Sequence, residues 1–281
     1  MTKTIGGNIL VRLGNTYTVG NFKGGVGKTK IVAMLAYDNS QIRKRKTLVI
    51  DLDPQANATT AIAKSFDVED VDKTIVDGIT KDDLKSSITT IDENLDLIAG
   101  STDFFSFPIW VNDLEDEQQQ ILWLDGLLDP IRGDYDEIFI DVPPTISAFS
   151  DNAMAASDFS IIAFQTVEES YEGVEKYVKY QEFMVKRYDI DLQIIDIIPC
   201  MTESTDELDI ELLKDAKAAY GNIVSDNIVY YQKRIKKYSN TGITLKRFKN
   251  GNYDQWDYRA HSVFLDILTE LDARREFLSN E

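Results

Sequence analysis

A glycine-rich segment between an apolar strand and a helical run constrains this chain more than any other feature. It reads Gly20-Asn21-Phe22-Lys23-Gly24-Gly25-Val26-Gly27-Lys28-Thr29-Lys30. The glycines let the backbone turn tightly, and the amides freed by the turn point the same way as the positive end of the following helix. Lys28 adds a positive charge, and Thr29 offers a hydroxyl group to Mg²⁺. The segment predicts an anion-binding loop; a purely structural turn is the alternative.

Short runs of β-branched residues alternate with longer amphipathic stretches along the chain. Strands are expected at 17–20, 47–52, 95–99, 137–142, 159–164, 192–198 and 227–230. Helices are expected at 28–39, 56–66, 117–131, 147–156, 171–188, 208–220 and 258–277. Most of these strands are continuous apolar runs, as in parallel sheets whose two faces are covered. The pattern predicts an α/β fold with a mostly parallel, twisted sheet and helices on both faces.

Nothing in the sequence marks a second domain, since it contains no internal repeat and no Pro-rich or Gly/Ser-rich linker. We expect one domain over residues 1–281, with a possible N-terminal hairpin at 8–20 that turns at Gly14-Asn15. Only about 15 residues precede the first core strand, too few for a helix-turn-helix module.

Two of the expected strands end in acidic residues. Segment 47–59 runs from an apolar strand into Asp51 and Asp53, and segment 137–144 ends in Asp141 and two prolines. Ligands bind at the C-terminal edge of open parallel sheets, so these carboxylates should lie beside the anion-binding loop. For Asp51 and Asp53, capping of the helix that begins near residue 56 is the alternative.

These segments resemble the motifs of one family of P-loop NTPases. Segment 23–29, KGGVGKT, is similar to the deviant Walker A motif of the ParA/MinD superfamily, segment 47–59 to its switch I, and segment 137–144 to its Walker B motif and switch II. The resemblance implies slow, Mg²⁺-dependent hydrolysis of ATP by a homodimer that forms with ATP. Lys30 departs from the pattern, because that position usually carries a second hydroxyl residue.

The resemblance also implies roles for individual residues. Lys23 would reach the phosphates held by the other subunit, Lys28 would bind phosphate within its own subunit, and Asp53 would orient the attacking water. The magnesium site would comprise Thr29, Asp51 and Asp141. The nucleotide-binding set would be Lys23, Gly24, Gly25, Val26, Gly27, Lys28, Thr29, Lys30 and Met201. Core packing is an equal alternative for Met201 and for Cys200.

Composition argues against some branches of the superfamily. Cys200 is the only cysteine and His261 the only histidine, which opposes the iron–sulfur members and any His-rich metal site. The chain has no secretory signal and no run of about 18 apolar residues, so we expect a cytoplasmic protein without a membrane partner. A MinD-like, membrane-associated positioning ATPase stays the alternative, although the acidic stretch 264–281 opposes docking on anionic lipid.

Basic residues gather in one window of an otherwise acidic chain. Residues 227–253 contain seven cations and no acid, where an even distribution would give about four or five acids. Since the net charge of the chain is −18, the remainder carries −25. The cations are Lys233, Arg234, Lys236, Lys237, Lys246, Arg247 and Lys249. We expect this region to bind DNA without reading its sequence; a solvated surface is the alternative.

With the resemblance, this region predicts a ParA-type partition ATPase. The ATP-bound dimer would bind nonspecific DNA, associate with the nucleoid of a bacterium and segregate a plasmid or chromosome. Because no DNA-reading module precedes the core, a small centromere-binding protein would supply specificity and stimulate hydrolysis.

Overall fold

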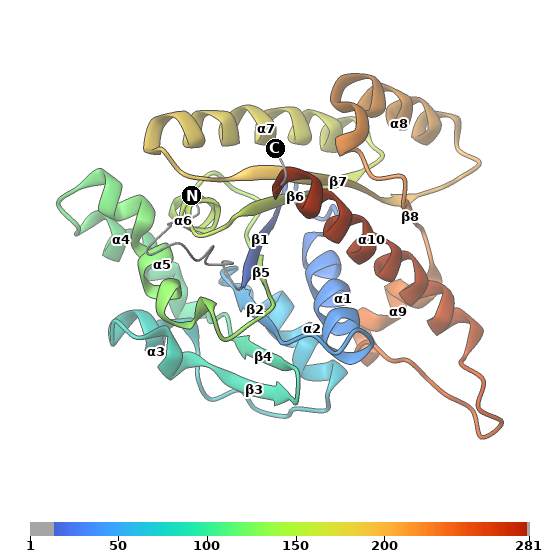
Figure 1. The fold of residues 1–281 in the computed structure, drawn as a ribbon, viewed down its shortest axis with the longest axis horizontal. Helices are drawn as coiled ribbons and strands as arrows, with labels where there is room; N and C mark the ends of the chain where they lie inside the picture. Colours follow the sequence, from blue (N-terminus) through green and yellow to red (C-terminus); the bar gives the residue numbers. More distant parts are fainter. Residues whose placement is uncertain (1–13, 280–281) are drawn as a thin grey trace.

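The computed structural model describes residues 14–279, and its strands form one eight-stranded sheet in the order β3-β4-β2-β5-β1-β6-β7-β8 (Figure 1). The strands are β1 (Asn15–Gly20), β2 (Thr47–Asp51), β3 (Thr89–Asp92), β4 (Leu95–Ile98), β5 (Glu137–Asp141), β6 (Phe159–Gln165), β7 (Gln193–Thr202) and β8 (Val229–Tyr230). Every neighbouring pair is parallel except β3 with β4. The predicted α/β fold with a mostly parallel sheet is confirmed.

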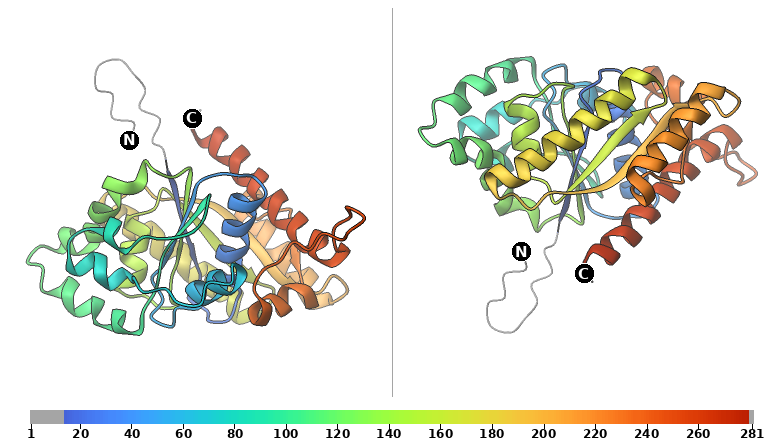
Figure 2. Two further views of the ribbon diagram at one scale, coloured as in Figure 1. Left: turned by 90° about the horizontal axis from the view of Figure 1, so that it is seen from below. Right: turned by 90° about the horizontal axis from the view of Figure 1, so that it is seen from above.

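Helices cover both faces of this sheet (Figures 1 and 2). One face carries α1 (Lys28–Gln41), α2 (Asn57–Ser65), α9 (Lys233–Thr241) and α10 (Gln255–Ser279). The other carries α3 (Ile75–Thr80), α4 (Phe107–Asn112), α5 (Glu117–Arg132), α6 (Ala148–Ala155), α7 (Glu168–Tyr188) and α8 (Glu207–Tyr220). Short 3₁₀ turns lie at η1 (Leu84–Ser87), η2 (Thr102–Ser106) and η3 (Gly221–Ile223).

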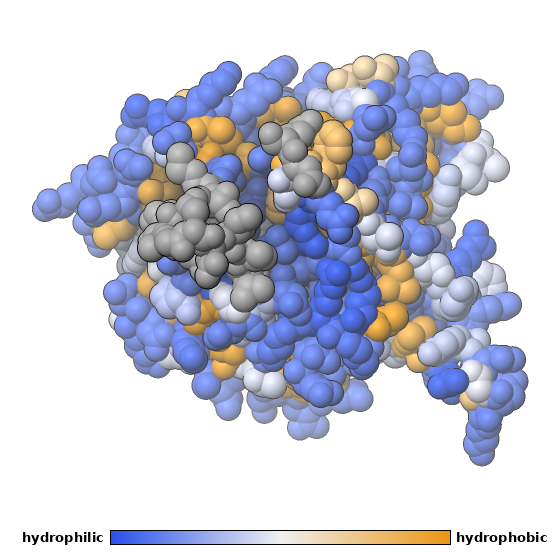
Figure 3. All heavy atoms as spheres, viewed as in Figure 1, coloured by the Kyte–Doolittle hydropathy of each residue, from blue (hydrophilic) through white to orange (hydrophobic). Residues whose placement is uncertain are grey.

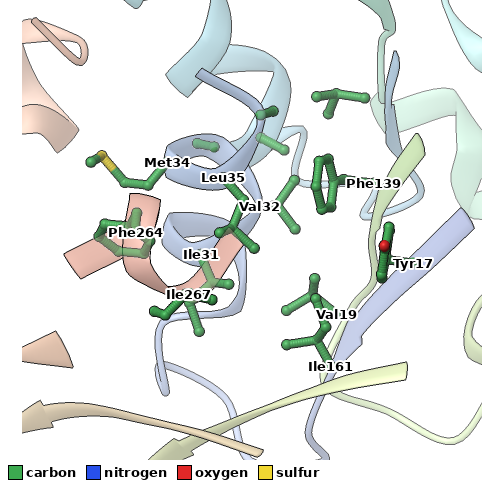
Figure 4. Close-up of a cluster of buried hydrophobic side chains, with 14 of the residues drawn as sticks. Tyr17, Val19, Ile31, Val32, Met34, Leu35, Phe139, Ile161, Phe264 and Ile267 are labelled. Carbon is green, nitrogen blue, oxygen red and sulfur yellow. The ribbon is translucent and has the colours of Figure 1, made fainter. Parts of the chain in front are cut away.

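Alternation along the buried strands divides the core into clusters on the two faces. In β2, Val49 joins the cluster under α1, whereas Leu48 and Ile50 join the cluster under α5 and α6. Figure 4 shows the first cluster, where Ile31 of α1 and Phe264 of α10 gather with residues of the central strands. Because both faces of the sheet are covered by helices, most residues of the central strands are apolar, as the sequence predicted.

Four elements were not predicted. Strand β3 is a short edge strand of partly exposed, mostly polar residues, so it lacks the apolar run that identified the others. Helices α3, α4 and α9 span only six to nine residues. Their signals were local, such as the capping box of α3, in which Thr74 and Asp77 bond each other's backbone.

The first arm of the expected N-terminal hairpin, residues 8–13, lies outside the described residues. Asn15, expected in its turn, is instead the first residue of β1 and pairs with Glu137.

Candidate nucleotide site and basic surface

The glycine-rich loop lies at the C-terminal end of β1, between β5 and β6 in the sheet, and leads directly into α1. Gly25 and Gly27 have φ angles of 79° and 96°, in the left-handed region that favours glycine. A Cβ atom on Gly25 would meet nothing within 4 Å. The loop therefore leaves open space beside backbone that can approach a ligand closely, as a phosphate cradle requires.

Asn21 fixes the loop to the rest of the fold, a role that the sequence analysis missed. Its Nδ2 donates to the carbonyl oxygen of Ala163 in β6 at 2.8 Å, and its Oδ1 accepts from the backbone N–H of Lys23 at 2.8 Å. The side chain is buried. Further along the loop, the Cys200 thiol of β7 donates to the carbonyl oxygen of Val26 at 2.9 Å. The loop is thus held at two points by the neighbouring strands β6 and β7.

The two lysines of the loop differ in their surroundings. Lys28 is buried, and its Nζ donates to the carbonyl oxygens of Asn21 at 3.1 Å and of Lys23 at 3.2 Å. Burial lowers the pKa of Lys28, against the opposing charges of Asp141 and Asp53. The Lys23 side chain is exposed. Lys28 therefore lies within the cradle of its own chain, whereas Lys23 is free to meet a group outside it.

The predicted carboxylates come together beside the loop. Asp51 and Asp141 are register partners on the adjacent strands β2 and β5. The Thr29 hydroxyl donates to Oδ2 of Asp141 at 2.7 Å. Burial raises the pKa of Asp141, and the nearby charge of Asp51 raises it further. Burial likewise raises the pKa of Asp51, to about 6.

Asp51 also meets the first turn of α2. Its Oδ2 accepts from the backbone N–H and the hydroxyl of Thr59, both at 2.8 Å, and its Oδ1 accepts from the N–H of Asp53 at 3.1 Å. The helix-capping alternative is therefore right in part for Asp51, because it satisfies a free amide of α2. Asp53 is less buried, and its Oδ1 accepts from the Gln55 N–H at 2.9 Å.

These donors fit a magnesium ion bound with a nucleotide. Oδ1 of Asp141 is buried and has no hydrogen-bond partner among residues 14–279. Within the same residues, no group of three or more His, Cys, Asp and Glu side chains could hold a metal ion. Mg²⁺ usually keeps several waters and combines one or two carboxylates with substrate phosphates, which suits Thr29, Asp51 and Asp141.

Met201 and Lys30 lie at the borders of this site. Met201 has a φ angle of 56°, and its methyl group would be 3.8 Å from a Cβ atom on Gly27, so it is placed against the loop. Lys30 turns away from the loop: its Nζ donates to the Ser239 hydroxyl of α9 at 2.8 Å. Burial lowers the pKa of Lys30. The Lys30 side chain is therefore directed to α9 and not to the phosphate cradle.

The cations of the basic window lie on α9 and on the loop that leads to α10. Six of them are exposed: Lys233, Lys236, Lys237, Lys246, Arg247 and Lys249. Arg234 is the exception, since it is half-buried and pairs with Asp254 at 2.8 Å and with Asp257 at 3.3 Å. Both acids lie just beyond the window. Figure 3 shows that the face drawn in Figure 1 is mostly hydrophilic, with small, scattered apolar patches.

A phosphate-binding loop at the C-terminal edge of a parallel sheet, with carboxylates on the two strands beside it, defines a P-loop ATPase that uses ATP and Mg²⁺. The family model described as an AAA domain matches residues 14–194, which is more than half of the chain. The chain belongs to this family, and it is a ParA-type ATPase of the ParA/MinD superfamily.

Known proteins of similar sequence and structure support this assignment. The sporulation initiation inhibitor protein Soj of Bacillus subtilis is 27% identical over 264 residues, covering 93% of this chain and 99% of Soj. A putative plasmid partition protein of Borrelia burgdorferi bound to AMPPNP matches with a TM-score of 0.73 and 21% identity, covering 92% and 99% of the two chains. An ATP complex of McdA from Cyanothece matches with a TM-score of 0.78 and 19% identity, covering 92% and 96%. The two structures share the fold.

In residues 14–279, no helix is long and apolar enough to cross a membrane.

Proposed function

We propose that this chain is the ATPase of a DNA-partition system, acting in the cytoplasm on the nucleoid. Several relatives carry partition names, such as the chromosome-partitioning ATPase Soj of Treponema pallidum, which is 27% identical over 241 residues. The observation that carries the proposal is a nucleotide site and a cationic surface on one chain, joined by the contact between Lys30 and Ser239. With ATP bound, two copies would dimerise and hold DNA; hydrolysis would release it.

Within the site, each residue has a proposed task. Lys28 and the loop amides bind the phosphates of ATP, and the exposed Lys23 reaches the phosphates of the partner subunit. Thr29, Asp51 and Asp141 hold Mg²⁺, which would neutralise the negative charge of the phosphates. Asp53 orients water for attack. Phosphoryl transfer depends mainly on such positioning and charge neutralisation, so this set suffices for slow hydrolysis.

Two substitutions separate binding from hydrolysis. Lys28→Ala should abolish ATP binding, because it removes the cation inside the cradle. Asp53→Ala should retain ATP binding and ATP-dependent dimerisation but lose hydrolysis by about 10²–10⁴-fold, the usual contribution of a side chain placed against the attacking nucleophile. Fluorescent-nucleotide titration, size-exclusion chromatography and phosphate release measure the three properties. Wild-type turnover in the Asp53 variant would remove Asp53 from the mechanism.

The DNA surface would comprise the six exposed cations of the basic window. Arg234 is left out of it, because its charge is already paired. If about three cations in each subunit touch phosphate, the dimer neutralises roughly six, and log K should fall with log salt at a slope near −5. Affinity should then drop about a thousandfold between roughly 50 and 200 mM salt. Random duplexes should compete equally, since phosphate contacts carry no sequence information.

Matched triple variants test this surface. Replacing Lys233, Lys236 and Lys237 by alanine should flatten the salt slope and leave basal ATP hydrolysis unchanged. The control replaces Lys179, Lys186 and Lys214 by alanine, three exposed lysines on the opposite face of the sheet, with the same change in net charge. Equal DNA affinities of the two variants in ATP would leave the basic window as a solvated surface.

A small centromere-binding protein is the proposed partner, which would supply sequence specificity and stimulate hydrolysis. The acidic remainder of the chain would attract a basic partner. Membrane docking of a MinD-like kind is disfavoured by α10. Its Arg274 pairs with Asp196 and Glu270, and Arg275 pairs with Asp272 and Glu137, so neither arginine is available to anionic lipid.

A further inference from the structure

A cleft of about 380 Å³ opens where β8 leads into α9 and meets the first turns of α10. These elements lie together at the right of Figure 1. Its walls combine aromatic rings with cations, chiefly Tyr230, Tyr231, Lys233, Lys237, Trp256 and Arg259. The three rings are 39%, 46% and 53% exposed for Tyr230, Tyr231 and Trp256. Large aromatic side chains that stay this exposed side by side mark a binding surface.

The lining of the cleft contains four cations and no acid, and two acids that follow the basic window are engaged by other groups. Asp254 and Asp257 pair with Arg234, which also lines the cleft. Asp257 further accepts from the Tyr238 hydroxyl at 2.7 Å and from the Lys246 N–H at 2.8 Å. Arg234 therefore acts as a fixed wall, and the charge that faces solvent is positive. An anionic ligand with a flat ring matches both the cations and the aromatic rings of the lining.

We propose that this cleft binds one nucleotide unit, with an unstacked base against Trp256 and Tyr231 and its phosphate against Lys233, Lys237 and Arg259. This inference rests on the proposed DNA surface and refines it. Contacts to phosphate would involve only the cations and give no role to the aromatic rings of Trp256 and Tyr231. In an intact duplex the bases are stacked on one another, so these rings could not stack on them. Aromatic platforms beside cations are the usual means of holding single strands. The volume of the cleft is within the range of small-molecule sites.

The consequence is a preference for nucleic acid with accessible bases, such as a single-stranded segment or a strand end. Base stacking on one aromatic platform changes affinity by about 5- to 150-fold in known cases. The surface would thus bind duplex through its outer cations and hold an open strand more tightly through the cleft.

Trp256 provides a direct probe, because stacking on a base quenches indole fluorescence. The full-length protein, with and without ATP, is titrated with a short oligothymidylate, a hairpin duplex of equal charge, thymidine monophosphate and a polyglutamate of equal charge. Quenching by oligothymidylate at lower concentration than by duplex is expected. Binding of the monophosphate with similar affinity would assign the cleft to a free nucleotide; binding of the oligonucleotide alone would assign it to a strand. Equal quenching by polyglutamate would show an acidic-peptide site and overturn the proposal.

Variants locate the effect. Trp256→Ala and Tyr231→Ala should each weaken oligothymidylate binding by about 5- to 150-fold and change duplex affinity by less than about twofold. Trp256→Phe keeps a ring and should retain most of the affinity. The control is Tyr258→Ala, since Tyr258 is 61% exposed on the same helix but does not line the cleft. Lys179→Ala, an exposed lysine on the opposite face of the sheet, is the matched cation control for Lys233→Ala.

The outcomes distinguish this inference from the proposed function. Duplex binding that survives with no preference for oligothymidylate, or equal losses in the Trp256 and Tyr258 variants, overturns the cleft and leaves the partition proposal in place. Oligothymidylate binding without any ATP-dependent duplex binding would overturn the partition proposal and leave the cleft in place.

Discussion

Gly173 of α7 lies against the side chain that fixes the phosphate loop. A Cβ atom added there would come closer than 3.0 Å to Oδ1 of Asn21 and would lie 3.4 Å from the Lys23 Cβ. Real Cβ atoms do not show contacts under 3.0 Å, so Asn21 must move. Its bonds to the Ala163 carbonyl oxygen and the Lys23 N–H would then be strained or lost. Gly173→Ala should therefore damage both stability and nucleotide binding.

The magnitude follows from opposing effects. Alanine is favoured over glycine in a helix by about 1 kcal/mol. Against this gain, overpacking costs about 1–3 kcal/mol, and leaving a buried polar group unsatisfied costs about 1–3 kcal/mol. We expect a net loss of roughly 1–5 kcal/mol in the free energy of unfolding. Displacement of the Lys23 backbone should also weaken ATP binding by roughly tenfold, the worth of about one hydrogen bond.

Gly126→Ala is the matched control. Gly126 lies within α5, and a Cβ atom there would meet nothing within 4 Å, so the same substitution should stabilise the protein by about 0.5–1 kcal/mol. Urea unfolding followed by circular dichroism gives both values. In an Asn21→Ala background, Gly173→Ala should become neutral or stabilising, because the clash is gone. Additive losses in this double-mutant cycle, or stabilisation by both glycine replacements, would refute the reasoning.

Three further outcomes follow from the structure. Lys30→Thr restores a hydroxyl beside the phosphates at the expense of the Ser239 contact, so titration calorimetry should show ATP bound roughly tenfold more tightly. Burial raises the pKa of Cys200 to about 12, so iodoacetamide at about pH 8 should alkylate the folded protein roughly a thousandfold more slowly than the unfolded chain, measured by mass spectrometry. Burial raises the pKa of Asp38 to about 6, and the bond to Asp38 raises the pKa of His261 although burial opposes it. The folded state therefore binds both protons more tightly than the unfolded state, so the stabilisation from this pair is lost as pH rises from about 4 through the raised pKa of His261. In the wild-type protein, the midpoint of urea unfolding should fall between about pH 5 and 8. In Asp38→Asn this fall should be less steep.

The central strands and the phosphate loop could be predicted because their signals are local. An apolar run, a glycine turn and the following helix lie consecutively in the sequence from Tyr17 to Gln41. Asp51 and Asp141 could be placed at one edge because the C-terminal ends of parallel strands share it. Strand β3 escaped prediction because an antiparallel edge strand needs no apolar run.

Contacts between distant segments could not be predicted in this way. Asn21 reads as a loop residue until β6 places the Ala163 carbonyl oxygen within 2.8 Å of its amide. Arg234 reads as a free cation until the fold brings Asp254 and Asp257 to it. In both cases the hydrogen-bond or ion-pair partner is determined by tertiary packing, which cannot be predicted from a single sequence.

The unpredicted helix α9 packs against α2, the helix that follows Asp53. Gly242, the residue that follows α9, has a φ angle of 74°, and a Cβ atom there would clash with the backbone of Lys64 and Ser65 at the end of α2. The next residue, Ile243, donates its N–H to the Ser65 hydroxyl at 2.8 Å. Helix α2 begins directly after the Asp53 segment, and Asp51 holds its first turn. Because this junction has no room for a methyl group, the end of α2 and the residues that follow α9 are in close contact. The cations of α9 therefore lie beside a helix whose first turn is bound by Asp51.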